Sequence, residues 1–219
     1  MSEFAKTALN RVRRMPERGA YDKATIYPIV DEALICHVGF MEETGQPVVI
    51  PTLHARRGEQ ILLHGASTSR LMKVAASGIP LCITVTHVDG LVLARSIFHH
   101  SANYRSAVLF GHGTLVTDET EKMAVLATFT EKLIPGRWDD ARIPTDIELK
   151  ATAVVAVEIE NASAKIRSGG PKDDAEDYAL DVWAGVLPIQ QHFQAPEADG
   201  QLREGIALPN YLTARIGTL

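Results

Sequence analysis

The sequence predicts a mainly β protein of the α+β class, an antiparallel barrel with flanking helices. Short apolar runs of strand length recur between residues 34 and 159, and Gly, Asp and Pro separate them. Most neighbouring runs are joined by turns of hairpin length rather than by helices. This pattern favours an antiparallel barrel over a parallel, doubly wound sheet.

Each element has a local signal. A helix is expected over residues 21–33, with Asp22 as its cap, and a strongly amphipathic helix over 119–133. Asp89-Gly90 predicts a hairpin turn, and Gly111 and Gly113 predict a kink or bulge in a long strand. The expected strands span residues 34–40, 47–54, 61–64, 81–88, 91–98, 104–116 and 152–159.

Composition narrows the function. A chain of 219 residues with 46% hydrophobic residues is long enough for one substantial globular domain. Its formal charge of -5 gives no electrostatic reason to expect a nucleic-acid partner. The basic residues near the N-terminus are interpreted as a solvated arm; they are Arg11, Arg13, Arg14 and Arg18.

The sequence also predicts a cytoplasmic protein with no membrane contact. No apolar segment approaches the roughly 20 residues that span a bilayer. The basic N-terminal residues are not followed by the apolar stretch of a secretion signal. Cys36 and Cys82 fall in predicted strands, as expected for free, buried thiols in a reducing compartment.

The segment from Gln60 to Arg70 predicts an anion site. The apolar run 61–63 leads to Gly65, and hydroxyl side chains at 67–69 then precede a short helix that Gly78 ends. A helix start presents free backbone N–H groups and a partial positive charge, and Arg70 adds a full charge. A phosphate is the expected occupant.

A second cluster, residues 99–106, suits a planar ligand that carries a phosphate. Tyr104 and Ser106 alternate on a predicted strand and share a face, whereas Arg105 points to the other side. An aromatic ring, a hydroxyl and a guanidinium would then stand at one strand entrance. The alternative is an edge strand with a surface arginine.

Other chemistries lack their motifs. His99 and His100 are adjacent and would point apart on a strand, and the chain has no HExxH or CxxC pattern, so no metal site is predicted. It also has no Rossmann or Walker glycine pattern and no GxSxG nucleophile turn. The acidic pair Asp173-Asp174 is interpreted as solvated surface charge.

Taken in order, the motifs resemble the FMN-binding split barrels related to pyridoxamine 5'-phosphate oxidase, in the branch that includes nitroimidazole-resistance proteins. The resemblance covers residues 18–188, most of the chain. The matching segments are His37-Val-Gly-Phe40, Val49-Ile-Pro-Thr52, His64-Gly-Ala66 with Ser69-Arg70, Asp89-Gly-Leu-Val92, Asn103-Tyr-Arg-Ser106, Pro135-Gly-Arg-Trp138, Ala164-Lys-Ile-Arg167 and Trp183-Ala-Gly-Val-Leu-Pro188.

The resemblance implies a six-stranded antiparallel split barrel with flanking helices, a homodimer with two FMN molecules at its interface. It implies one domain over residues 1–190 and a tail or arm over 191–219. The Trp183 segment is expected to reach the flavin near that interface. The implied FMN-binding residues are Ile50, Pro51, Thr52, His64, Gly65, Ala66, Ser67, Ser69, Arg70, Tyr104, Arg105, Ser106 and Trp183.

Two functions follow as hypotheses. The first is a flavin-dependent oxidoreductase acting on a small planar acceptor, such as a nitroaromatic or quinone-like molecule. The second is a carrier or sensor that binds flavin or haem without turnover, with a haem ligand among His37, His54, His64 and His87. Vitamin B6 oxidation is not expected, because His192 and Arg203 in the tail do not match the substrate-binding segment of those oxidases. No catalytic residue is predicted.

Overall fold

The structure is a computed structural model that describes residues 2–218. Its strands are β1 (Gly19–Ala20), β2 (Ile35–Met41), β3 (Pro47–Leu53), β4 (Ala55–Arg57), β5 (Gln60–Ala66), β6 (Pro80–Leu93), β7 (Ser101–Leu115), β8 (Thr152–Glu158), β9 (Asn161–Arg167) and β10 (Gly185–Pro188). Its helices are α1 (Lys23–Glu32), α2 (Arg70–Ala76), α3 (Glu119–Leu133), α4 (Arg137–Asp140), α5 (Asp146–Ala151) and α6 (Asn210–Thr213). Short 3-10 turns are η1 (Pro16–Arg18), η2 (Ile97–His99) and η3 (Ala175–Ala179).

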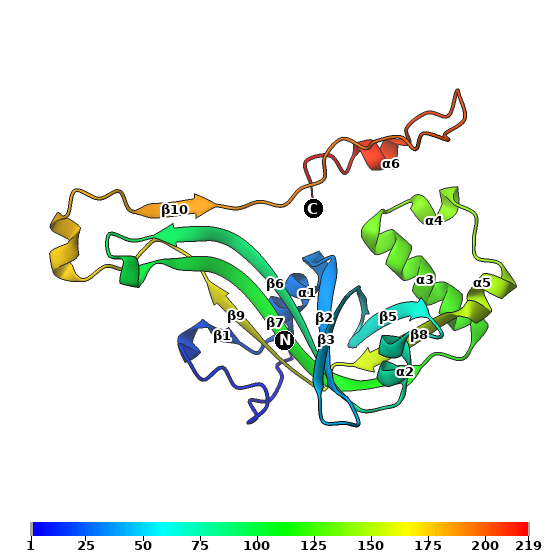
Figure 1. Ribbon diagram of the computed structural model, residues 1–219, viewed down its shortest axis with the longest axis horizontal. Helices are drawn as coiled ribbons and strands as arrows, with labels where there is room; N and C mark the ends of the chain where they lie inside the picture. The colour runs from blue at the N-terminus through cyan, green and yellow to red at the C-terminus, as the bar shows by residue number, and fades with distance from the viewer. Residues whose placement is uncertain (1, 219) are drawn as a thin grey trace.

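The long antiparallel pair β6–β7 runs through the centre of the sheet (Figure 1). Along the main path the strand order is β3-β2-β6-β7-β8-β5-β4, while β9 pairs with β7 and β1, and β10 pairs with β6. The end strands β3 and β4 do not pair with each other, so the sheet curls into a barrel that stays open. This confirms the predicted antiparallel split barrel with flanking helices.

β7 changes partner at two glycines. Its first part pairs with β9 as far as Phe110, and its last part pairs with β8 from Gly113 onward. A Cβ on Gly111 would lie 1.7 Å from the carbonyl oxygen of Glu158, and one on Gly113 would lie 2.2 Å from that of Ala75. Only glycine allows this close approach, at the corner where the sequence predicted a kink or bulge.

Two apolar clusters hold the barrel together. The larger cluster joins the inner face of the sheet to α1 and α2, and it contains the buried Cys36. The smaller one joins β5 and β8 to α3 through Leu62, Val154, Val125 and Phe129. Helix α3 has the predicted bounds, and its buried residues are Val125 and Phe129.

The predicted hairpin at Asp89-Gly90 is wrong. β6 continues through these residues to Leu93, with a register shift between Val88 and Gly90, and the chain turns back only at η2. The reason is tertiary: β10 pairs with β6 here, and a Cβ on Gly90 would lie 2.9 Å from the carbonyl oxygen of Leu187. Pairing on both sides keeps the strand extended.

Four strands escaped prediction: the short β1 and β4, and the later β9 and β10. β9 follows the strand expected to be the last, and β10 forms at the end of the segment Trp183-Ala-Gly-Val-Leu-Pro188. Residues beyond β10 form an arm that crosses from the tip of the sheet to α3 and α4 (Figure 1). There Arg137 donates to the hydroxyl of Tyr211 at 2.9 Å. The proposed division at residue 190 stays a prediction, and its outer bounds, residues 1 and 219, lie outside the described residues.

No helix within residues 2–218 combines the length and the apolar character that a membrane crossing requires.

Candidate functional site

Three of the implied FMN-binding residues, Ile50, Pro51 and Thr52, lie on β3, which forms one end of the sheet path. It pairs only with β2, with Pro51 opposite His37 and Thr52 opposite Cys36. Pro51 is tolerated there because an edge strand does not need every backbone donor. The unpaired side of β3 therefore offers backbone groups to a ligand at the rim of the barrel.

The predicted phosphate segment leaves β5 and enters α2. Ser67 donates its backbone N–H to Ala151 at 2.8 Å, and Ser69 donates its own to Ala66 at 2.8 Å. Ser69 is the N-cap of α2, but its side chain does not cap the helix. The first-turn N–H groups of α2 and the serine hydroxyls are therefore without protein partners in residues 2–218, although α2 has only seven residues.

Arg70 stands at this helix start with a loose partner. Its Nη1 lies 3.4 Å from Oε1 of Glu42, and its side chain is 59% exposed. An exposed pair of this geometry contributes little to stability. The guanidinium is therefore free to exchange Glu42 for a phosphate.

His64 faces away from the main core, toward α3. Its ring packs edge-on against Phe129, with centroids 4.3 Å apart, and its Nδ1 is buried without a hydrogen-bond partner. Burial lowers the pKa of His64. The ring borders a cavity of about 300 Å³ whose lining is mostly apolar: Leu53, Leu126, Leu133, Trp138, Ile143 and Pro144.

The other histidines proposed as haem ligands differ from His64. Nε2 of His54 lies 2.9 Å from the carbonyl oxygen of Val30, and Nε2 of His87 lies 2.9 Å from that of Ile29. His37 is exposed on β2. Of the four, His64 alone combines a cavity, apolar surroundings and unbonded ring nitrogens within the described chain.

The strand prediction for Tyr104, Arg105 and Ser106 is confirmed in β7. Ser106 donates its hydroxyl to the carbonyl oxygen of Lys165 at 3.2 Å and faces the N-terminal segment. Arg105 lies on the opposite face. The alternation that the sequence predicted therefore separates Arg105 from Ser106.

Arg105 is already neutralised. Its guanidinium donates to both carboxylate oxygens of Glu32 and to the carboxylate of Asp89, with contacts of 2.9 Å to each acid. These two acids raise the pKa of Arg105, and Arg105 lowers that of Glu32. Together with His87 they line a cavity of about 800 Å³ under residues 188–192 of the arm. Arg105 is thus not an unpaired cation for a phosphate.

Trp183 lies in the loop between η3 and β10, at the far end of the sheet. Its side chain is 68% exposed, and its ring covers Gly185, where a Cβ would lie 2.9 Å from the indole.

Within one chain, the predicted site is therefore divided. The phosphate segment lies beside α2, which packs at the Gly113 end of β7. Tyr104 stands nine residues earlier in the same strand, which corresponds to about 30 Å at 3.3 Å per residue. The structure therefore does not bring Tyr104, Ser106 or Trp183 to His64 and Arg70; β10, which follows Trp183, lies at the end of the sheet away from α2 (Figure 1).

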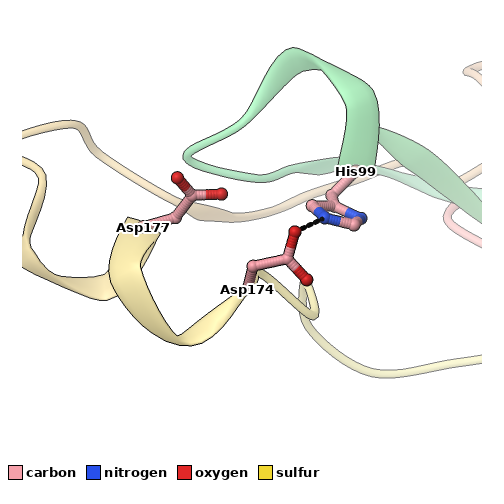
Figure 2. A group of neighbouring side chains, drawn as sticks. All are labelled: His99, Asp174 and Asp177. Atoms are coloured by element: carbon pink, nitrogen blue, oxygen red, sulfur yellow. Dashed lines mark hydrogen bonds and ion pairs between the residues drawn. The ribbon is translucent and has the colours of Figure 1, made fainter.

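One group of side chains has the composition of a metal site. Figure 2 shows His99 of η2 bonded to Asp174, with Asp177 beside the pair. Nε2 of His99 lies 3.2 Å from Oδ2 of Asp174, and one ligand atom from each of the three residues lies within 4.8 Å of the others. Asp174 is 70% exposed and serves as the partner of His99, so this group supplies no argument for an ion beyond its composition.

Two parts of the structure were missed by the sequence analysis. The apolar wall around His64 comes from α3 and residues 138–144, and a group of cations gathers near η1 and β9. Signals for both were present, because Pro135-Gly-Arg-Trp138 and Ala164-Lys-Ile-Arg167 are among the segments on which the resemblance rests.

An open, curled antiparallel sheet with helices at its ends defines this molecule as a split-barrel protein. The chain belongs to the pyridoxamine 5'-phosphate oxidase-like family, because the family model described as pyridoxamine 5'-phosphate oxidase matches residues 22–166. The predicted family is thereby confirmed. No curated protein matches the chain in sequence.

Two solved structures are similar over nearly the whole chain. The flavocytochrome Anf3 from Azotobacter vinelandii is 38% identical with a TM-score of 0.89, and the match covers 95% of this chain and 97% of that one. The FAD and haem binding protein from Mycobacterium smegmatis is 33% identical with a TM-score of 0.87, covering 91% and 98%. A 5-nitroimidazole antibiotic resistance protein from Bacteroides thetaiotaomicron is 22% identical with a TM-score of 0.58, covering 68% and 86%, and shares the fold.

Proposed function

We propose that this protein is a flavin-binding redox protein. The observation that carries the proposal is its full-length similarity, at 38% identity, to a protein described as a flavocytochrome. The edge strand β3 and the Arg70 segment provide backbone groups, hydroxyls and a cation suited to a flavin with its phosphate. A bound flavin supplies the electron-transfer chemistry, and the chain orients it and excludes water.

The resemblance to the family implies that the bound flavin is FMN. A relative 33% identical to this chain is described as binding FAD, which makes FAD the competing assignment. The two differ by an adenosine monophosphate, so denaturing the purified protein and identifying the released flavin by chromatography decides between them. Protein that is colourless as purified and takes up neither flavin would contradict the proposal.

The proposed active form is a homodimer. One chain holds the two halves of the predicted site about 30 Å apart along β7, so a single flavin can touch both only if they come from different subunits. Trp183, before β10, and Leu187, within it, are 68% and 55% exposed, as residues that contact a partner subunit would be in a single chain. Sedimentation of the flavin-loaded protein should show a dimer; a monomer that retains flavin would contradict this interface.

The proposed reaction is reduction of a small planar acceptor, such as a nitroaromatic or quinone-like molecule, by the reduced flavin. A flavin ring on an edge strand would leave one face open to a planar molecule. Anaerobic reduction of the holoprotein, followed by addition of a quinone or a nitroaromatic compound, should reoxidise the flavin. Flavin that stays reduced with both classes of acceptor would favour a carrier or sensor.

The cavity at His64 favours haem as a second ligand. A haem needs apolar walls and an axial ligand with a free ring nitrogen, and His64 meets both conditions. The depressed pKa keeps its imidazole neutral, the form that binds iron. The relative from Mycobacterium smegmatis is described as binding haem. The relative from Azotobacter vinelandii is called a flavocytochrome, a class of protein that carries haem.

Haem binding has a direct test. His64→Ala should lose the Soret band that appears when haem is added to the wild-type protein, while its flavin content is measured separately. His112→Ala is the matched control, because His112 is exposed and lies outside this cavity. An unchanged Soret band in His64→Ala would remove His64 as the ligand.

A further inference from the structure

A basic cleft lies at the end of the molecule opposite α2. The N-terminal segment around η1, the β6–β7 turn and the end of β9 enclose a cavity of about 680 Å³. We define the basic cleft by its four cations, Arg14, Arg18, Arg167 and Lys172. Its volume falls within the range of small-molecule sites.

These four cations have no carboxylate partner. No ion pair within 4.0 Å involves any of them in residues 2–218, and Glu17 is the sole acid among the lining residues. The chain carries a formal charge of -5, so acids are not scarce. Most arginines elsewhere do find one: Arg56, Arg57, Arg70, Arg95, Arg105, Arg137 and Arg142.

Arg167 is the clearest case of a cation in the cleft without an anionic partner. Its side chain is buried and donates only to neutral oxygens, the side-chain amide of Asn103 and the carbonyls of Gly169 and Gly170. Burial and the nearby charge of Arg18 both lower the pKa of Arg167. A buried guanidinium that also feels the charge of a second one is stabilised by an anion bound to both.

The rim of the cleft adds an aromatic surface. Phe98 is 88% exposed, yet its turn is held in place, because Asp173 accepts from the backbone N–H of Arg95 at 2.9 Å and of Ser96 at 3.2 Å. A fixed, exposed ring suits stacking of a planar base. Met15, which also lines the cleft, has φ 54°, the one positive φ of a non-glycine residue in the described chain. Such backbone strain concentrates at ligand sites.

We propose that the basic cleft binds the diphosphate group of a nucleotide, with the base against Phe98. Two phosphates match several convergent cations, and arginine can hold phosphate oxygens through two parallel hydrogen bonds. The diphosphate has two sources that share this chemistry: the ADP half of an FAD whose flavin is bound by a second copy of the chain, or a separate dinucleotide that acts as electron donor. The first source rests on the proposed flavin binding, whereas the second rests on the cleft alone.

Calorimetric titration of the purified protein with ADP, pyrophosphate and adenosine tests the cleft. If the purified protein carries no FAD, ADP and pyrophosphate should bind and adenosine should not, with affinity that falls as salt rises. Arg18→Ala and Lys172→Ala should each weaken ADP binding about ten- to a hundredfold. Lys150→Ala is the matched control on exposed helix α5 and should change nothing. Phe98→Ala should weaken ADP more than pyrophosphate.

The flavin content of the variants distinguishes the two sources of the diphosphate group. If Arg18→Ala loses FAD but still takes up FMN as the wild type does, the cleft holds the ADP half of FAD, and free ADP will not bind while FAD is present. If flavin content is unchanged and ADP competes with NADPH, the cleft holds a separate dinucleotide. The proposal is overturned if ADP binds no better than adenosine and the FAD content of both variants equals that of the wild type.

Discussion

The ammonium nitrogen of Lys132 lies 3.2 Å from Nε2 of His54 in the interior of the protein. Lys132 also donates to the carbonyl oxygens of Ala33 at 2.8 Å and of His54 at 3.0 Å, and it thereby ties the end of α3 to α1 and to the start of β4. Two groups that both become cationic on protonation are thus held together out of water. Burial lowers the pKa of Lys132 to about 8, and burial together with the charge of Lys132 lowers that of His54 to about 4.

His54 should make the protein sensitive to acid. Because its folded pKa of about 4 lies below the unfolded value near 6.5, the unfolded chain binds more protons between these two pH values. Stability should therefore fall as the pH drops from 6.5 to 4, by about 3 kcal/mol at most. Urea unfolding over this range should show a shallower pH slope in His54→Gln. His37→Gln, at an exposed position of β2, should keep the wild-type slope, and an equal slope in His54→Gln would show that His54 is not the group responsible.

Lys132 should make the stability of the protein depend on pH in the alkaline range. Its folded pKa of about 8 lies below the unfolded value of 10.5, so the unfolded chain binds more protons in between and stability should rise as the pH goes from 8 to 10.5. Lys132→Met should lose this rise. It should also cost about 1–3 kcal/mol, because the carbonyls of Ala33 and His54 lose a donor. Lys150→Met on exposed α5 serves as the control; a rise preserved in Lys132→Met would contradict the assignment.

Arg70→Ala should weaken FMN binding about ten- to a hundredfold if the guanidinium pairs with the flavin phosphate, a contact worth about 1.5–3 kcal/mol. Its loose contact with Glu42 leaves it available for this role. Lys should restore only part of the affinity, because it lacks the planar fork. Lys73→Ala, in the next turn of α2, is the control. Equal weakening of FMN and riboflavin binding would show that Arg70 does not recognise the phosphate.

Gly111→Ala should destabilise the barrel by about 3 kcal/mol or more, because the new Cβ would lie 1.7 Å from the carbonyl oxygen of Glu158 and two strands would have to separate. Gly200→Ala is the matched control, since a Cβ there has no neighbour within 4 Å. The free energy of unfolding in urea measures both. A Gly111→Ala protein as stable as the control would mean that the strand corner relaxes easily.

Local signals predicted the elements that are complete within one segment. Helix α3 begins and ends at the predicted residues because Asp118 caps it and Val125 and Phe129 repeat at helical spacing. The opposite faces of Arg105 and Ser106 followed from strand alternation alone. Where a remote strand decides the outcome, local signals failed: Asp89-Gly90 has the composition of a hairpin turn, yet pairing with β10 keeps it in β6.

The predicted site shows the same division. Sequence order alone indicated the segments around β3, His64 and Tyr104, and the family is confirmed. It did not show that Arg105 is neutralised by Glu32 and Asp89, because an ion pair between distant residues depends on how the chain folds back.

Alternation, helical spacing and turn residues act over a few neighbours, so they predicted an antiparallel barrel and its main helices, and the resemblance of the ordered motifs indicated the split-barrel family. Which charged side chains form ion pairs and which do not depends on the tertiary structure. In the folded chain Arg105 pairs with Glu32 and Asp89, the cations of the basic cleft have no acidic partner within residues 2–218, and His64 borders an apolar cavity. Those outcomes depend on distances between residues far apart in the chain, which only the packed barrel sets.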